Sequence, residues 1–502
     1  MSEKDIKNLR EPDCVNQTMP DSEVKLMQLP ATADSDSAAE QMSLWAAVRE
    51  SVRGGHQHDY TKGPIGRAII LLAIPMVLEM CMESVFAVVD IFWVAHLGAD
   101  AIAAVGLTES MLTLMYAVAI GLSIGATAMV ARRVGENNPE GAARAAVQAL
   151  ALALIVSVVF AVIGVTLAPR LLWAMGGSPW VLEHGVAFTR IMFAGNASIL
   201  LLFLINAVFR GAGDAAIAMR VLWLANAINI LLGPCFIFGL GPFPEMGVAG
   251  AAVATTIGRS TGVVYAFSRL IRSGGRFDLR KEHIRLEPAI MARLLRLSST
   301  ATFQVFIGMA SWIGLIKTIS GFGSNAVAGY TIGVRVLVFA LLPSWGMANA
   351  AATMVGQALG ARKPERAERA VWIAGFYNMI CLGSVGLIFV IFTRQIIGLF
   401  TDDPNIAYYG VDCLRIVAYG FLFYAYGMVL TQSFNGAGDT WTPTIINLFV
   451  FWLWELPLAY VLAIVFKVGP RGVFLSIMIA FSTLAVISAL VFRRGKWKTQ
   501  VV

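Results

Sequence analysis

Long apolar segments separated by short polar loops occupy most of this chain. As a helix, an apolar segment of about 20 residues is long enough to cross the roughly 30 Å hydrocarbon core of a membrane. The pattern predicts twelve such helices, at residues 67–94, 107–131, 143–167, 184–209, 217–240, 247–271, 290–318, 330–355, 368–392, 407–433, 441–466 and 471–492. A membrane β-barrel would instead show short segments of alternating polarity. We therefore expect an all-α polytopic membrane protein.

An internal repeat divides these helices into two sets of six. The segment Phe-Arg-Gly-Ala-Gly-Asp at 209–214 returns as Phe-Asn-Gly-Ala-Gly-Asp at 434–439. The same shift along the chain, without a gap, aligns pairs in other segments: Gly98 with Gly323, Gly135 with Gly360, Pro139 with Pro364, Arg144 with Arg369, and Gly185 with Gly410. Because each half makes an even number of crossings, the two should be parallel repeats. A duplicated string of membrane helices is typical of a transporter with a central site between its halves.

Composition along the chain sets the expected boundaries. Residues 1–61 are polar and lack the apolar core of a signal peptide, so we expect a disordered cytosolic tail, with a short interfacial helix near 44–52. The rest of the chain is predicted to form an N-lobe, a basic cytoplasmic loop, a C-lobe and a cytosolic C-terminal tail, at residues 62–271, 272–289, 290–494 and 495–502.

The charged residues are few, and most lie between the apolar segments. Charged residues make up 14% of the chain and hydrophobic residues 58%, whereas a soluble globular protein has roughly a quarter of its residues charged. The net charge of +7 does not indicate a nucleic-acid partner, because most Lys and Arg residues lie in loops, where they act as topology signals. The more basic loops follow the even-numbered helices. This bias predicts a protein of the inner (plasma) membrane with both termini in the cytoplasm.

Three carboxylates project from one face of the first predicted helix. At about 100° per residue, Glu83 lies about 40° and Asp90 about 20° around the helix from Glu79, and the three stack over roughly 16 Å. Carboxylates at membrane depth usually face water or a partner, and they often mark an ion path. All three cannot be ionised cheaply, so this group could exchange protons or, with neutral oxygens nearby, hold a sodium ion. Structural pairing with Arg259 is the alternative. Pro75, one turn upstream, removes a backbone hydrogen bond and could bend the helix.

Several segments of the chain resemble the MATE (multidrug and toxic compound extrusion) family. They are Val-Val-Asp-Ile-Phe-Trp-Val-Ala-His-Leu-Gly at 88–98, the Phe-Arg-Gly-Ala-Gly-Asp loop, Asn229-Ile-Leu-Leu followed by Pro234, and Met-Gly-Val-Ala-Gly-Ala-Ala at 246–252. They occur in order and at family-like spacing, and the resemblance covers about residues 62–494. It implies an ion-driven exporter whose two six-helix lobes enclose a V-shaped central cleft.

The resemblance also implies which polar residues couple ion binding to transport. Asp90 matches the first-span aspartate of the family, and Pro75 matches the proline proposed to bend the first helix. Asn206, Asn229 and Thr255 match polar residues of the fourth, fifth and sixth spans. We expect these three to surround the carboxylates of the first helix, and a sodium ion, if one binds, would lie at Asp90, Asn229 and Thr255.

The chain departs from the family pattern in ways that change the expected site. Gly233 stands where many members carry a second aspartate, so we hypothesise that Glu83 supplies the missing acid, with Glu79 as its neighbour. In the C-lobe, Gln304 and Tyr424 stand where other members have acids, which assigns coupling to the N-lobe. These two residues are expected to line the substrate cleft.

A further buried acid of the C-lobe, Glu455, is also expected to line the cleft, although a structural partner for it is an open alternative.

The leading prediction is a secondary antiporter that exports amphiphilic, cationic organic compounds in exchange for protons or sodium ions. A flippase for lipid-linked oligosaccharides, from the same superfamily, is the alternative, and the acidic stripe disfavours it. No motif of an intramembrane enzyme is recognised. We expect no cofactor besides the coupling ion, and a monomer in the bilayer with a small-molecule substrate as its partner.

Overall fold

The computed structural model describes residues 44–53, 58–272, 283 and 285–500 of the chain. The chain divides into two units, residues 1–46 and 47–502, and the second is compact. The tail expected to be disordered and most of the basic loop at 272–289 lie outside the described residues. The short helix expected near 44–52 is present as α2 (Leu44–Arg53).

Each of the twelve predicted membrane segments corresponds to a long helix or a group of consecutive helices. Within the described residues, ten are long and apolar enough to cross a membrane. They are α3 (Ile65–Ala95), α4 (Ala99–Gly135), α5 (Pro139–Ala174), η1 (Val181–Gly185) with α6 (Val186–Ala194) and α7 (Asn196–Ala212), α8 (Ala215–Phe238), α10 (Pro288–Ser320), α11 (Ser324–Gly360), α12 (Pro364–Gly398), α15 (Trp441–Asn447) with η3 (Leu448–Glu455), α16 (Leu456–Tyr460) and η4 (Val461–Val465), and α17 (Pro470–Arg493).

Two further segments complete the twelve. The pair α13 (Pro404–Ala418) and α14 (Phe421–Ala437) forms one span that is bent by 59°. The last is α9 (Val248–Arg272), which has 25 residues but is less apolar than the ten spans named above. Its Thr255 and Arg259 are buried inside the protein. A helix whose polar residues point into the protein can cross a membrane without being strongly apolar overall.

The internal repeat is visible in the backbone. Helices α4 and α11 both have 37 residues, and α7 and α14 both have 17. Before α4 and α11, Gly98 and Gly323 have φ angles of 99° and 100°. After α7 and α14, Gly213 and Gly438 have φ angles of 87° and 86°, a conformation that glycine adopts without steric cost. The two Gly-Ala-Gly-Asp segments therefore form the same tight turn, as the sequence predicts.

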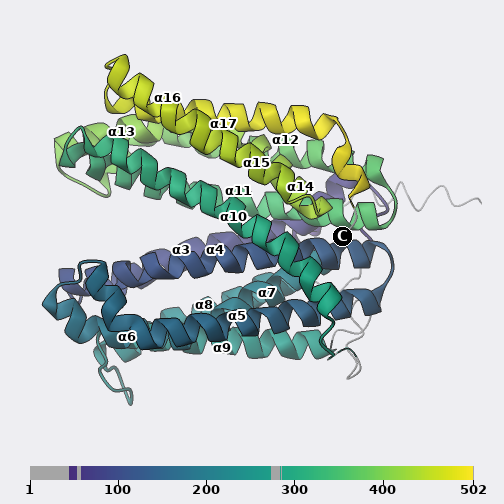
Figure 1. Ribbon diagram of the computed structural model, residues 1–502, viewed down its shortest axis with the longest axis horizontal. Coiled ribbons are helices and arrows are strands. Elements are labelled where there is room, and N and C mark those ends of the chain that lie inside the picture. The colour runs from purple at the N-terminus through teal and green to yellow at the C-terminus, as the bar shows by residue number, and fades with distance from the viewer. Residues whose placement is uncertain (1–43, 54–57, 273–282, 284, 501–502) are drawn as a thin grey trace, which may run out of the picture. The chain divides into compact units, whose positions relative to one another are not determined.

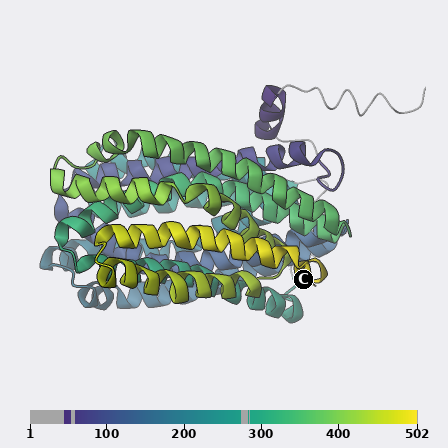
Figure 2. The same ribbon diagram turned by 90° about the horizontal axis from the view of Figure 1, so that it is seen from above.

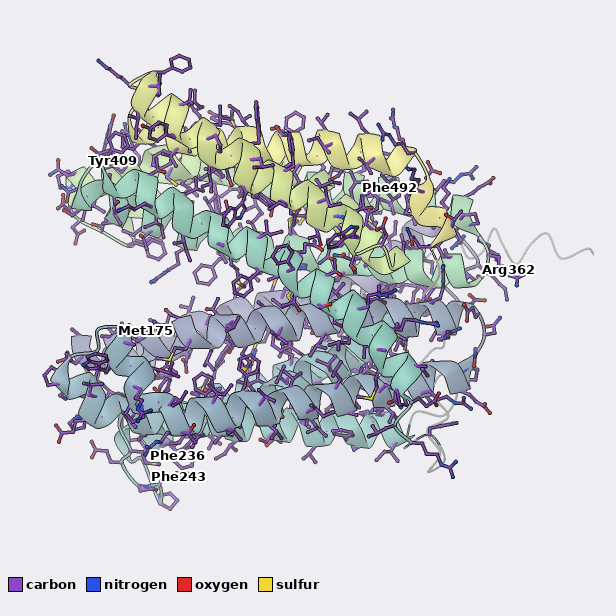
Figure 3. The ribbon with its side chains drawn as sticks, in the orientation of Figure 1. Met175, Phe236, Phe243, Arg362, Tyr409 and Phe492 are labelled. Atoms are coloured by element: carbon purple, nitrogen blue, oxygen red, sulfur yellow. The ribbon has the colours of Figure 1, made fainter. Side chains whose placement is uncertain are left out.

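The helices of the second unit form two halves, α3 to α9 and α10 to α17, shown in blue to teal and in green to yellow (Figure 1). Helix α3 packs against α11, and α10 crosses over α4. In Figure 1 and in the view turned by 90° in Figure 2, the long helices run roughly along the longest axis of the bundle. Arg362 lies at one end of the bundle, and Met175 and Tyr409 lie at the other (Figure 3). We call the first of these the basic end. Its basic residues lie in the last turn of α4, between α11 and α12, and in the first turn of α12, and they are Arg132, Arg133, Arg362, Lys363 and Arg366.

At the basic end the two halves touch backbone to backbone. A Cβ added to Gly135, the last residue of α4, would lie 2.8 Å from the Cα and the carbonyl carbon of Gln357 on α11. A Cβ added to Gly360 would lie 2.9 Å from the Cα of Gly135. Gly135 and Gly360 are counterparts in the repeat, so α4 and α11 approach each other symmetrically. Toward the opposite end the ribbons of the two halves diverge (Figure 1), which agrees with the expected V-shaped arrangement.

The C-terminal segment contacts both halves at the basic end. A short helix, η5 (Lys496–Thr499), follows α17 and places Trp497 in the C-terminal half with 1% of its surface exposed. The indole stacks on Phe492 with ring centroids 4.5 Å apart. Arg132 of the N-terminal half donates a hydrogen bond to the carbonyl of Gln500. The predicted C-terminal tail is therefore packed onto the bundle as far as it is described.

Candidate functional site

A cavity of about 200 Å³ lies between the two halves, and we call it the carboxylate cavity. From the N-terminal half it is lined by Glu79 and Glu83 of α3, Asn206 and Arg210 of α7, and Arg259 of α9. From the C-terminal half its polar lining residues are the uncharged Asn349, Gln432 and Asn435. The N-terminal half therefore contributes two acids and two bases, and the facing half contributes amides.

Glu79 forms a buried ion pair inside this cavity. Its Oε1 lies 2.8 Å from Nη1 of Arg210, and it also accepts a hydrogen bond of 3.3 Å from the Asn206 amide. Glu79 is 1% exposed and Arg210 is 9% exposed. The second carboxylate oxygen of Glu79 has no protein partner within the described residues, and neither has the side-chain oxygen of Asn206. Both oxygens can still accept a hydrogen bond from water or coordinate a small cation.

Glu83, one turn along α3, has a looser set of partners. Asn226 of α8 donates a hydrogen bond of 3.0 Å to Oε2, and Oε1 lies 3.8 Å from Nη2 of Arg259. The guanidinium of Arg259 also lies over the ring of Phe86, 5.9 Å from its centroid. Pairing with Arg259 was the structural alternative for these acids, and it is Glu83 that makes this contact. Because the contact is longer than a direct hydrogen bond, a water or an ion can intervene between the two groups.

The remaining ion-coupling candidates do not line the carboxylate cavity. Asn229 of α8 donates a hydrogen bond of 2.8 Å to Thr255 Oγ1 of α9, whose own hydroxyl donates to the carbonyl of Ala251 at 2.9 Å. Asp90 is partly exposed near the end of α3, and its carboxylate has no hydrogen bond or ion pair within the described part of the chain. The structure therefore divides the six candidates into two groups, Glu79, Glu83 and Asn206 at the cavity, and Asp90, Asn229 and Thr255 away from it.

Pro75 lies inside α3, one turn before Glu79, where the two halves meet. Helix α11 approaches α3 closely there, since a Cβ on Gly346 would lie 2.6 Å from the carbonyl oxygen of Met76. A proline at this point leaves one carbonyl of the preceding turn without its helical hydrogen bond. The first helix is therefore locally weakened next to its contact with the other half.

A second cavity, of about 340 Å³, lies within the C-terminal half, and we call it the aromatic cavity. Gln304, Tyr424 and Glu455, the three residues expected at the substrate cleft, all line it. Its walls carry further aromatic rings, from Trp312, Trp345, Phe451 and Phe481. The Tyr424 ring stacks on Phe481 with centroids 3.8 Å apart.

Glu455 is the one acidic residue that lines the aromatic cavity, and no basic residue lies among the described residues of its wall. The side chain is 2% exposed, and Ser311 Oγ donates a hydrogen bond of 2.7 Å to its Oε2. Side-chain oxygens of Gln304, Thr431 and Asn447 in the same wall have no partner in the part of the chain that the structure describes. A wall with this many unused acceptors suits a ligand that donates hydrogen bonds or carries positive charge.

Sequence reasoning did not find Arg210, the partner of Glu79. Arg210 lies in the Phe-Arg-Gly-Ala-Gly-Asp segment, which was interpreted as a turn and not as part of a site. A signal was present in the repeat, because the shift that aligns the two halves pairs Glu79 with Gln304 and Arg210 with Asn435. An acid and a base that are both replaced by amides in the second copy indicate that the two side chains depend on each other.

Both halves of the chain match the same family model. The model, MatE, covers residues 75–235 and again residues 288–461. The chain belongs to the MatE family. The resemblance seen in the sequence motifs is thereby confirmed, and the paired match reproduces the internal repeat.

Proteins of similar sequence are named as multidrug resistance proteins. The probable multidrug resistance protein YoeA of Bacillus subtilis is 26% identical over 426 residues, which are 84% of this chain and 92% of that protein. The probable multidrug resistance protein NorM of Thermotoga maritima is 27% identical over 443 residues, 87% of this chain and 94% of that protein. These relatives support a role in multidrug export for this member of the MatE family.

Solved MATE transporters share its fold. A MATE structure in complex with MaL6 superposes with a TM-score of 0.83 at 27% identity, covering 89% of this chain and 100% of that one. An outward-facing MATE family transporter of the MOP superfamily gives 0.82 at 27% identity, with 89% and 99% covered. The chain is thus a membrane-embedded, all-helical transporter with twelve helices in two lobes, as expected from its sequence.

Proposed function

We propose that this protein is a secondary antiporter that exports amphiphilic organic cations in exchange for protons or sodium ions. The basic end faces the cytoplasm at the inner (plasma) membrane, because Lys and Arg concentrate in its turns and in the helix ends next to them. The protein acts as a monomer with both termini on that side. The names of its relatives support multidrug export, and the choice of a cationic substrate rests on the aromatic cavity.

The observation that carries this proposal is the Glu455 carboxylate, which lies among aromatic rings in a wall whose described residues include no base. An isolated carboxylate is costly to bury in its charged form unless a positive charge accompanies it. A proton can neutralise it when the cavity is empty, and an organic ammonium group can do so when substrate is bound. Aromatic faces attract cations and cover flat apolar surface, so Trp312, Tyr424 and their neighbours suit a flat, lipophilic cation.

The coupling ion binds in the N-terminal half. The carboxylate cavity and the aromatic cavity share the lining residues Leu342, Trp345 and Gln432, so they adjoin each other. Ion binding and substrate binding can drive each other only if they favour opposite conformations. A proton at Glu79 or Glu83, in the wall between the halves, can bias the same movement that opens or closes the aromatic cavity. Asn229 and Thr255 form a hydrogen-bonded pair in the same half, and together with Asp90 they would supply the oxygens that a sodium ion needs.

The purified protein in liposomes tests the proposal, with ethidium as the probe. Ethidium accumulation against its gradient is measured after imposing a pH gradient alone, a sodium gradient alone, or neither. An uncharged aromatic compound of similar size is the control. We expect accumulation of ethidium with one of the two ion gradients and none without a gradient. Equal movement of both probes in the absence of any gradient would show a passive channel.

Glu83→Gln tests whether the acids of α3 carry the coupling. Glutamine keeps the side-chain shape and can still contact Asn226, but it cannot hold a proton or a negative charge. Ion-driven ethidium accumulation should fall by at least about tenfold, because a coupling free energy of a few kcal/mol disappears. Glu140→Gln, a change of the same type at an exposed position on α5, should transport normally. Wild-type accumulation by the Glu83 variant would remove this carboxylate from the coupling site.

A further inference from the structure

Arg210 makes one set of contacts through its side chain and another through its main chain. Its side chain lies in the carboxylate cavity, with Nη1 2.8 Å from Oε1 of Glu79. Its main chain lies in the last turn of α7, at the contact between the two halves. One residue therefore touches both the charged site and the place where the basic end is held closed.

The main-chain contacts join α7 to α11 of the other half. Thr353 Oγ1 donates a hydrogen bond of 3.2 Å to the carbonyl of Arg210, and Gln357 Nε2 donates one of 2.9 Å to the carbonyl of Gly211. Both donors are buried. Helix α7 ends at Ala212, so its last carbonyls have no partner within the helix. The Arg210 carbonyl also accepts a hydrogen bond of 2.9 Å from the backbone N–H of Gly213 in the following turn, so Thr353 is its second donor. The hydrogen bonds from Thr353 and Gln357 join the two halves, and both are lost when the halves separate.

The internal repeat carries uncharged residues at the same two positions. The shift that aligns the two copies places Gln304 and Asn435 at the positions of Glu79 and Arg210. The Asn435 amide donates to Gln432 on its own helix, at 2.8 Å. The turn that follows is the same in both copies, with φ angles of 87° and 86° at Gly213 and Gly438. Since the turn forms without an ion pair in the second copy, the Glu79–Arg210 pair is not needed to build it.

We propose that Arg210 is a positioning residue that transmits the charge of Glu79 to the contact between the halves at the basic end. This inference rests on the proposed antiport function and deepens it. A hydronium ion of the cavity transfers a proton to a carboxylate oxygen of Glu79, which forms an O–H bond and leaves water. The guanidinium of Arg210 cannot give up its own proton, so it is left as a buried charge without its partner.

The other charges around Glu79 determine where Arg210 then moves. Glu83 lies on the same helix and Arg259 lines the same cavity from α9, whereas the facing half contributes only amides to the polar lining. The remaining negative charge is therefore Glu83, toward which the guanidinium is drawn. Because Arg210 is in the last turn of α7, this movement displaces the carbonyls that Thr353 and Gln357 hold. Proton binding thus favours opening of the basic end.

Distance measurements between spin labels test this relay. Labels are placed at Glu140→Cys and Glu365→Cys in a variant without the native cysteines. Both positions are exposed, and they are repeat counterparts at the starts of α5 and α12 in opposite halves. Electron-electron distance distributions are recorded in lipid nanodiscs from about pH 8 to about pH 5, a range in which a perturbed carboxyl group titrates. In the unmodified site, the population with a short distance should fall as the pH decreases.

Three variants give the expected pattern. Glu79→Gln resembles the protonated carboxyl group, so the short-distance population should be low at every pH, shifted by at least about tenfold in the equilibrium. Arg210→Asn leaves Glu79 without its partner, and the pH response should disappear. The double variant carries the Gln and Asn residues of the second repeat and no unpaired charge. It should regain the short-distance population and show no pH response.

The double variant separates this relay from a merely structural ion pair. If Glu79→Gln keeps the wild-type distances and pH response, or if the double variant still responds to pH as wild type does, Arg210 is not the relay. Ethidium transport in the same preparations separates the two proposals. If the Arg210 variants show the wild-type pH response in their spin-label distances and the protein still accumulates ethidium with an ion gradient, the relay is overturned and the antiport function stands. Loss of ion-driven transport in the unmodified protein overturns the antiport function itself.

Discussion

The backbone contact between the two halves provides a quantitative test of how the basic end closes. Gly135 of α4 faces the backbone of Gln357, and the change Gly135→Ala adds one methyl group at this contact. That methyl would overlap the Gln357 carbonyl oxygen most closely and would lie 2.8 Å from the Gln357 Cα, whereas ordinary contacts begin at 3.4 Å. The two backbones must therefore separate by about 0.6 Å or more, and neither is the flexible end of a side chain.

The expected magnitude follows from the cost of overpacking. Adding a methyl group to a well-packed contact costs about 1–3 kcal/mol. This cost applies only while the basic end is closed, because the contact is absent once the halves part there. The equilibrium between closed and open forms should therefore shift by about 5- to 150-fold toward the open form. The general effect of glycine to alanine on helix propensity is the same in both forms and cancels.

The spin-label pair at positions 140 and 365 measures this shift directly. Gly106→Ala on the same helix is the matched control, since a Cβ there would meet nothing within 4 Å. The short-distance population should decrease in the Gly135 variant and stay unchanged in the Gly106 variant. Equal populations in both variants, with both proteins folded and monodisperse, would refute the reasoning that this backbone contact defines the closed form.

Two further predictions concern the C-terminal half. Glu455→Gln removes the charge facing the aromatic cavity, so ethidium binding should weaken by about 2 kcal/mol or more, roughly 30-fold. Binding of an uncharged aromatic compound, measured in the same titration, should change little, and a parallel loss for both compounds would speak against a charge-based role. Trp497→Ala removes the buried ring that anchors the C-terminal segment and should free Lys498, whose ammonium lies 2.5 Å from Glu368. Trypsin cleavage at Lys498 should then accelerate by about tenfold or more. The control Trp173→Ala, at a side chain that is 73% exposed, should leave the cleavage rate unchanged. An unaltered rate in the Trp497 variant would mean that other contacts hold the segment.

The number and order of the membrane helices could be predicted from the sequence, but their lengths could not. The segment predicted at 107–131 is part of α4, which runs from Ala99 to Gly135. Hydropathy marks only the part of a helix that lies in hydrocarbon, and polar residues at its ends continue the same hydrogen-bonded structure in water. The bend between α13 and α14 was also not predicted. Only Tyr419 and Gly420 separate these helices, which is too short a break to alter the apolar pattern of a single span.

The candidate site was predicted in part. The periodicity of α3 placed Glu79 and Glu83 on one face, and both line the same cavity. Asp90 lies on that face by angle, yet it does not line the cavity, because the cavity ends before the last turns of α3 are reached. Helical periodicity gives a direction around the axis, whereas the depth and extent of a cavity depend on the helices opposite.

The sequence by itself determined the membrane class, the twofold repeat and the turns that repeat it. A bilayer allows an apolar segment little choice besides a helix, since every backbone amide must find a partner within the segment. The repeated glycines permit the positive φ angles that the same turns adopt in both copies. These constraints depend only on residues close together in the sequence, so they can be recognised without the tertiary structure.

Only the tertiary structure decided which charges are neutralised and which are left alone. Glu79 on α3 meets Arg210 on α7, far away in the sequence, while Glu455 meets the hydroxyl of Ser311. Nothing in the neighbouring sequence distinguishes these two acids, because the energy of a buried charge is set by groups brought near it from other helices. The same holds for Gly135 and Gly360, which become a contact between the halves only when α4 and α11 are packed together.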